Sequence, residues 1–153
     1  MITQQQLSEY VGKSIADVCQ NGYTSPAENH GAHFVSHALG YAFGVTCRMM
    51  GTGKGPAAGL RVDELFSKCK SVGVWSLRPA SLSTCLVFVA RAASVNLTAK
   101  SMTHAPRKHI GIFLGGVVWH YSSKHNQVVR EAPSLFALHQ PSPDNGMFYG
   151  SLP

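Results

Sequence analysis

Hydrophobic positions in the first half of the chain recur every three or four residues, which is the spacing of an amphipathic helix. The strongest helical pattern covers residues 31–49, and a shorter helix is predicted over residues 62–71. A further helix over residues 3–20 is predicted by the apolar positions Leu7, Val11, Ile15 and Val18. The first half of the chain is therefore predicted to be helical.

The pattern changes to that of β-strands in the second half. The run Cys85–Arg91 is rich in β-branched and aromatic residues and predicts a buried strand. Strands over His109–Leu114 and Val117–Ser122 flank a Gly-Gly pair, which favours a hairpin turn. A fourth strand is expected over Asn126–Arg130, and the tail from Ala132 is expected to hold a short helix and loops. Helices followed by an antiparallel sheet predict an α+β fold.

Composition restricts the class of protein. The chain has 153 residues, of which 44% are hydrophobic and only 13% charged, so it is not an intrinsically disordered chain. Its length fits a single domain over residues 1–153. The longest purely apolar run, Cys85–Ala90, is far shorter than the roughly 18 residues of a membrane-spanning helix. We therefore expect one folded domain without a membrane span.

The charge balance is basic, with 13 Lys and Arg against 7 Asp and Glu and a net charge of +6. Such a surface attracts polyanions, of which nucleic acid and the bacterial envelope are two candidates. The basic residues are scattered and no aromatic RNA-binding strand motif is present, so we do not expect a nucleic-acid partner. The four cysteines are widely spaced and form no CxxC pair, which predicts buried free thiols.

The histidines carry the most specific signal. Two of the eight, His109 and His120, lie on the two strands of the predicted hairpin, in apolar segments where a polar side chain needs a partner. The segment from Lys108 to Ser122 reads KHIGIFLGGVVWHYS. It closely resembles the catalytic-histidine hairpin of the NlpC-type peptidoglycan cysteine peptidases, which belong to the papain-like superfamily.

The resemblance implies a fold and two roles. The fold would be papain-like, with N-terminal helices packed on a small antiparallel sheet. His109 would be the general base, and His120 would orient its ring. The segment Cys85–Val89 resembles the preceding strand of that family, with Cys85 in place of the usual Asp.

The nucleophile helix of the family resembles the segment His30–Leu39, which reads HGAHFVSHAL. The family has a Cys where this chain has Gly31. A helix N-terminus lowers the pKa of a thiol, which explains why the nucleophile lies there. Gly31 has no side chain and cannot attack a carbonyl. Three explanations stay open: an inactivating substitution, a natural loss that leaves a binding module, or another thiol, Cys19 or Cys47, in its place.

Further residues are expected near the substrate. His30 and His33 adjoin position 31, and Trp75 lies in an insertion before the hairpin, so we expect them, with Trp119, to line the substrate cleft. His33 and His37 are four residues apart, as two zinc ligands on one helix face are. Because no H-E-x-x-H motif is present, we expect these histidines to be exposed or to support other groups that contact a ligand. We expect no metal or other cofactor, and a zinc-binding protein remains the third hypothesis.

The first functional hypothesis is a cysteine amidase or endopeptidase that cuts an amide in the stem peptide or cross-link of peptidoglycan. Residues 1–10 lack the basic and apolar regions of a secretory signal peptide. We therefore expect synthesis in the cytoplasm and export to the periplasm of a target bacterium by a dedicated system, such as type VI secretion, or release by phage lysis. A toxic antibacterial effector of this kind would need an immunity protein as partner. The second hypothesis is a non-catalytic module that binds peptidoglycan or a protein.

Overall fold

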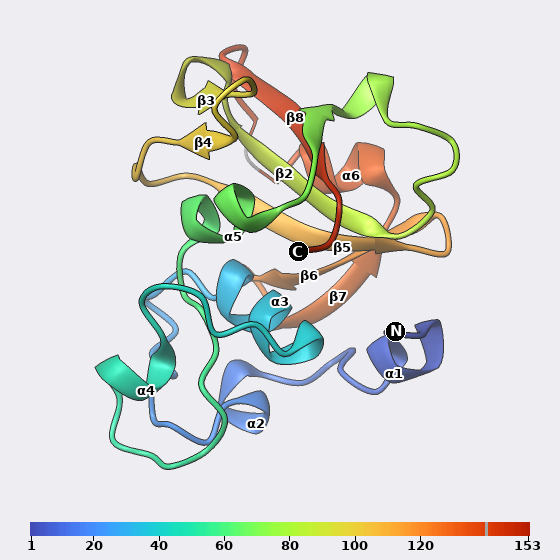
Figure 1. Ribbon diagram of the computed structural model, residues 1–153. Helices are drawn as coiled ribbons and strands as arrows, with labels where there is room; N and C mark the ends of the chain where they lie inside the picture. The colour runs from blue at the N-terminus through green and yellow to red at the C-terminus, as the bar shows by residue number, and fades with distance from the viewer. Residues whose placement is uncertain (140) are drawn as a thin grey trace.

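A six-stranded antiparallel sheet forms the centre of the protein, in the order β1-β8-β2-β5-β6-β7 (Figure 1). The computed structural model describes residues 1–139 and 141–153. The strands of this sheet are β1 (Val72–Val74), β2 (Cys85–Arg91), β5 (His109–Leu114), β6 (Val117–Ser122), β7 (Gln127–Glu131) and β8 (Asn145–Gly150). A separate small hairpin pairs β3 (Val95–Asn96) with β4 (Ser101–Met102). The predicted α+β class, with an antiparallel sheet, is confirmed.

The helices are short and lie mainly in the first half of the chain. They are α1 (Gln4–Ser8), α2 (Ile15–Val18), α3 (Gly31–Leu39), α4 (Cys47–Met50), α5 (Val62–Lys68) and α6 (Pro133–Ala137), with single 3-10 turns η1 (Trp75–Leu77) and η2 (Ala92–Ser94). Helix α3 packs against β5 and β6. None of the described helices is both long and apolar enough to cross a membrane.

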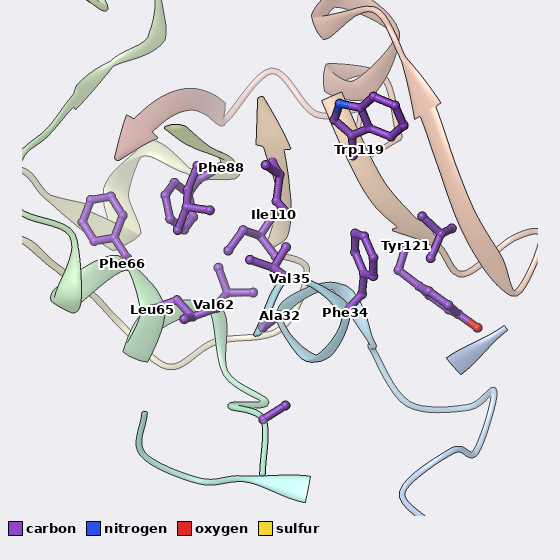
Figure 2. Packing of buried hydrophobic residues seen from close by; sticks show 14 of the residues in the cluster. Ala32, Phe34, Val35, Val62, Leu65, Phe66, Phe88, Ile110, Trp119 and Tyr121 are labelled. Atoms are coloured by element: carbon purple, nitrogen blue, oxygen red, sulfur yellow. The ribbon is translucent and has the colours of Figure 1, made fainter. Parts of the chain in front are cut away.

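Strand β2 is buried on both faces, because its alternating side chains enter two different clusters. Leu86, Phe88 and Ala90 join the main core, which α3 and α5 cover. Cys85, Val87 and Val89 join a smaller cluster on the other face, with Phe136 of α6. The labelled side chains of α3, α5, β2 and β5 gather in the main core in Figure 2. This two-sided burial explains the continuous apolar run in the sequence.

The β5–β6 hairpin forms as predicted. Gly115 and Gly116 have φ of 69° and 80°, a left-handed conformation that glycine adopts without strain. Gly111 permits a close approach of the two strands, since a Cβ there would lie 2.5 Å from Cγ1 of Val118. The hairpin places the strand that begins at His109 beside the strand that contains His120.

All three predicted helices are wrong in extent. The helix expected over residues 3–20 is divided into α1 and α2, because Gly12 has a φ of 87° and its N–H donates to the carbonyl of Val128. The helix expected over residues 31–49 ends at Leu39, where Gly40 adopts a φ of 76° and closes the helix. The chain continues as an irregular loop to α4. The helix expected over residues 62–71 is α5, which ends three residues earlier.

The tail contains a strand that the sequence pattern does not predict. Residues 145–150 form β8, which lies between β1 and β2 and pairs with both. Strand β1 is also unpredicted. Their short, glycine-containing sequences carry a weak strand signal, and hydrogen bonds to distant partners decide their conformation.

Tyr121 joins the N-terminal segment to the sheet, and this generates a stability prediction. Its buried hydroxyl accepts a hydrogen bond from the N–H of Ile15 at 2.9 Å and donates to Oδ1 of Asn126 at 2.6 Å. Tyr121→Phe leaves the buried N–H of Ile15 unpaired and should lower the free energy of unfolding by about 1–3 kcal/mol. Urea denaturation measures this loss.

The matched control is Tyr10→Phe. The hydroxyl of Tyr10 makes no side-chain hydrogen bond within the described residues, so its removal should change the free energy by less than about 0.5 kcal/mol. Equal losses in the two variants would contradict the role assigned to the Tyr121 hydroxyl.

Candidate active site

Three neighbouring strands each contribute one residue to a hydrogen-bonded relay. His109 is the first residue of β5, and its Nε2 lies 3.0 Å from Nδ1 of His120 on β6. Nε2 of His120 lies 2.5 Å from Oε1 of Glu131, the last residue of β7. Nε2 of His139 contacts the same carboxylate oxygen. The structure therefore brings the two predicted histidines together and adds a carboxylate to them.

The relay fixes the tautomer of each ring. The carboxylate of Glu131 only accepts, so Nε2 of His120 carries a hydrogen and donates it. The Nδ1 of a neutral His120 is then an acceptor, which receives the hydrogen on Nε2 of His109. Nδ1 of His109 is left with its lone pair, and it has no hydrogen-bonding partner within the described residues. His109 thus has the form that a general base requires.

Burial keeps both rings neutral at pH 7. The pKa of His109 is lowered to about 3 by burial and, secondarily, by His120 and His139. Phe136 stacks on the His109 ring with a centroid distance of 4.7 Å, which contributes to that burial. The pKa of His120 is also lowered by burial, although Glu131 opposes this effect. A protonated His109 would need a nearby anion to offset the loss of solvation.

Gly31 begins helix α3 and lies beside the start of β5. Its N–H donates to Oδ1 of Asn29 at 2.9 Å, and Nδ2 of Asn29 donates to the carbonyl of Lys108. A Cβ at position 31 would lie 3.3 Å from Oδ1 of Asn29 and 3.3 Å from Cγ2 of Ile110, the residue after His109. Both neighbours are side-chain atoms, and the φ of Gly31 is not positive. A small side chain therefore fits with a shift of a few tenths of an ångström.

A pocket of about 360 Å³ opens next to this relay. His109 and Asn29 line it, together with His139 and the loop of residues 123–125. The pocket therefore borders both His109 and Asn29, whose Oδ1 accepts a hydrogen bond from the N–H of Gly31. It is large enough for a few atoms of a peptide chain.

Three residues expected in the cleft are not there. His30, His33 and Trp119 are each 0–1% exposed, so the prediction that they line an open cleft is wrong. Trp119 points into the main core, where its indole N–H donates to the carbonyl of Leu114. Half-buried Trp75 packs on Phe113 and is not among the described residues that line the pocket.

The burial of His33 excludes exposure, which is one of the two alternatives expected for His33 and His37. His33 is completely buried and His37 is half-buried. Burial lowers the pKa of His37, and that of His33 falls to about 3 through burial and the neighbouring His37 and His30. Cys19 and Cys47, the alternative thiols, gather with these two histidines. The pKa of Cys19 is raised by burial, which is unfavourable for a nucleophile.

Sequence reasoning missed three residues of the site: Glu131, Phe136 and His139. Glu131 lies one position beyond the predicted fourth strand. Pairing of that strand with β6 would place Glu131 near His120. This pairing is the signal by which the sequence could have indicated Glu131. His139 and Phe136 lie in the tail, where no periodic pattern indicates which side chains turn toward the sheet.

No protein-family model matches this chain, and comparisons with curated proteins and with solved structures likewise find no match. Inference about its function therefore depends on the residues themselves.

The lowered pKa of His109 predicts a pH dependence of stability. The value is about 3 in the folded protein and 6.5 for a free histidine, so protonation favours the unfolded chain. The contribution of neutral His109 to the free energy of unfolding is fully present above about pH 6.5. Below that pH, the free energy of unfolding falls by about 1.4 kcal/mol per pH unit. His109→Gln removes this proton, so the free energy of unfolding should fall less steeply between about pH 6 and about pH 4.

Urea denaturation at several pH values measures the two slopes. Ser123→Gln replaces an exposed residue that does not titrate and should keep the wild-type slope. A slope in His109→Gln equal to that of the wild type would show that His109 is protonated equally in both states.

Proposed function

We propose that this chain has a papain-like fold of the NlpC type and carries the site of a peptidoglycan cysteine amidase or endopeptidase whose nucleophile position holds glycine. The observation that carries the proposal is the relay from Glu131 through His120 to His109, which leaves Nδ1 of His109 unprotonated. The strand order β2-β5-β6 and the packing of α3 on β5 support it. The chain as it stands binds its substrate without cutting it.

The chemistry of the parent site follows from the relay. A thiol at position 31 would give its proton to Nδ1 of His109, and the resulting thiolate would offset the burial of the imidazolium. The thiolate would attack an amide carbonyl, and His109 would return the proton to the leaving amine as the C–N bond breaks. Water, deprotonated by His109, would then cleave the thioester and regenerate the thiol. Glu131, through His120, would stabilise the positive charge at each protonation of His109.

The hydrogen bond from Gly31 to Asn29 favours binding as the present activity. In a cysteine hydrolase the backbone N–H of the nucleophile helps to hold the oxyanion. Here that N–H already donates to Oδ1 of Asn29 at 2.9 Å. Hydrolysis requires this bond to open, whereas binding does not. The net charge of +6 suits a polyanionic envelope.

Gly31→Cys should create peptidoglycan cleavage, because position 31 accepts a small side chain and His109 presents a free base. Purified peptidoglycan is incubated with the variant, and soluble fragments are measured by chromatography. Gly31→Ala is the matched control, since it makes the same Cβ contacts without a thiol and should stay inactive. Adding His109→Ala to Gly31→Cys should remove the cleavage. A folded Gly31→Cys variant that releases no fragments contradicts the proposed function.

Glu131→Gln, made in the Gly31→Cys background, tests the relay. The amide loses the negative charge and can donate its own hydrogens to Nε2 of His120, which reverses the tautomer of that ring. We expect cleavage to fall by about 10²-fold or more. Because Glu131 is a positioning residue, the rate should also show a changed pH profile, and Glu131→Asp should restore part of the rate. A reduced rate with an unchanged pH profile would indicate a purely structural role.

A further inference from the structure

Four potential metal-binding side chains from three separate segments, one of which is helix α3, lie close together. Cys19 directly follows α2, His33 and His37 lie one turn apart on α3, and Cys47 begins α4. One donor atom from each residue lies within 4.8 Å of the other three. Cys19, His33 and Cys47 are buried, and His37 is half-buried. Neither cysteine forms a disulfide.

The distances within this cluster are close to those of a tetrahedral zinc site. Zinc binds nitrogen at about 2.0–2.1 Å and sulfur at about 2.3 Å, which places two nitrogens about 3.3 Å apart and a nitrogen about 3.5 Å from a sulfur. Nε2 of His33 lies 3.2 Å from Nε2 of His37. Nε2 of His37 lies 3.8 Å from Sγ of Cys47. Small side-chain movements would complete the tetrahedron.

A neighbouring histidine fixes the orientation and tautomer of His33. Nε2 of His30 lies 2.7 Å from the carbonyl oxygen of Ser25, so this nitrogen carries a hydrogen and donates it. Nδ1 of His30 is then the acceptor for the hydrogen on Nδ1 of His33, at 3.0 Å. The lone pair of His33 is therefore on Nε2, the atom that faces the cluster. Metal-binding histidines are typically held by such an outer hydrogen bond.

Asn21 provides hydrogen bonds to both sulfur atoms. Its backbone N–H donates to Sγ of Cys19 at 3.4 Å, and its side-chain Nδ2 donates to Sγ of Cys47 at 3.2 Å. The same Nδ2 donates to the carbonyl of Pro56, which holds the side chain in place. N–H donors directed at sulfur stabilise the thiolate form, which is the form that binds metal.

We propose that Cys19, His33, His37 and Cys47 bind one zinc ion in a closed structural site. Two thiolates and two neutral imidazoles balance the charge of Zn²⁺, so a buried site carries no net charge. The two thiol protons are released as the metal binds. Thiolate and imidazole ligands in tetrahedral geometry favour zinc over magnesium or calcium, which prefer oxygen.

A second group of possible ligands, His120, Glu131 and His139, does not carry the same inference. Both histidines are at hydrogen-bonding distance from one carboxylate oxygen, and this group belongs to the relay.

The site would determine how α3 is held. The zinc would join the end of α2, the first two turns of α3 and the start of α4, which the chain otherwise connects through irregular loops. Because His33 lies two residues after Gly31, the ion would also fix the start of the helix that carries position 31. This inference goes beyond the proposed function and does not depend on peptidoglycan cleavage.

The test measures the metal content of the full chain, purified without a polyhistidine tag and without chelators. Mass spectrometry of the metals should find about one zinc per chain. His37→Gln and Cys47→Ser should each lower the zinc content by about tenfold or more. Cys69→Ser is the matched control, since Cys69 is also a buried free thiol but lies outside the cluster, and it should keep the zinc.

Replacement of zinc by cobalt provides a readout that needs no variant. Removal of the metal with a chelator should lower the melting temperature, and added Co²⁺ should give tetrahedral d–d absorption with thiolate charge-transfer bands. Folded wild-type protein that contains no zinc and binds no cobalt overturns the proposal. A Cys19–Cys47 disulfide detected by mass, or zinc that is lost in His139→Gln but kept in Cys47→Ser, also overturns it.

Discussion

The burial of helix α3 is the constraint on which both candidate sites depend. Its first six residues are buried, so a polar side chain among them is costly unless it has a partner inside the protein. One side of the helix packs on β5 and places Gly31 beside Ile110. Another side carries His33, which bonds to His30 and faces His37. A single short helix thus supplies the start of one candidate site and two proposed ligands of the other.

The sequence pattern predicts those parts of the fold that are locally determined. Strand β2 is recognisable because both of its faces are buried, so its apolar run is continuous. The β5–β6 hairpin is recognisable because its Gly-Gly turn carries its own conformational signal. Strand β8 and the break at Gly12 depend on partners far away in the chain, β2 and Val128. The local sequence of β8 does not distinguish it from a loop, whereas Gly12 and the capping box of Ser14 with Asp17 are local signals of the helix break.

The same distinction holds for the sites. His109 and His120 are joined by one hairpin, so their proximity follows from the predicted strands. Glu131 enters through a further strand pairing, and its role appears only when the register of β6 and β7 is known. Cys19 and Cys47 approach the α3 histidines through two irregular loops. The wide spacing of the cysteines therefore gives no sequence signal of this cluster. The hydrophobic character of the surrounding segments correctly predicts that the cysteines are buried.

The relay does not need a nucleophile to be stable, because each of its N–H donors has an acceptor within the relay. In the neutral state each ring nitrogen of His109 and His120 has a partner, except Nδ1 of His109. His109 lines the pocket, where water can reach Nδ1, the ring nitrogen that has no protein partner among the described residues. With glycine at position 31, the relay therefore has no unpaired N–H donor. The carboxylate of Glu131 orients His120, and through it His109, whether or not a side chain is present at position 31.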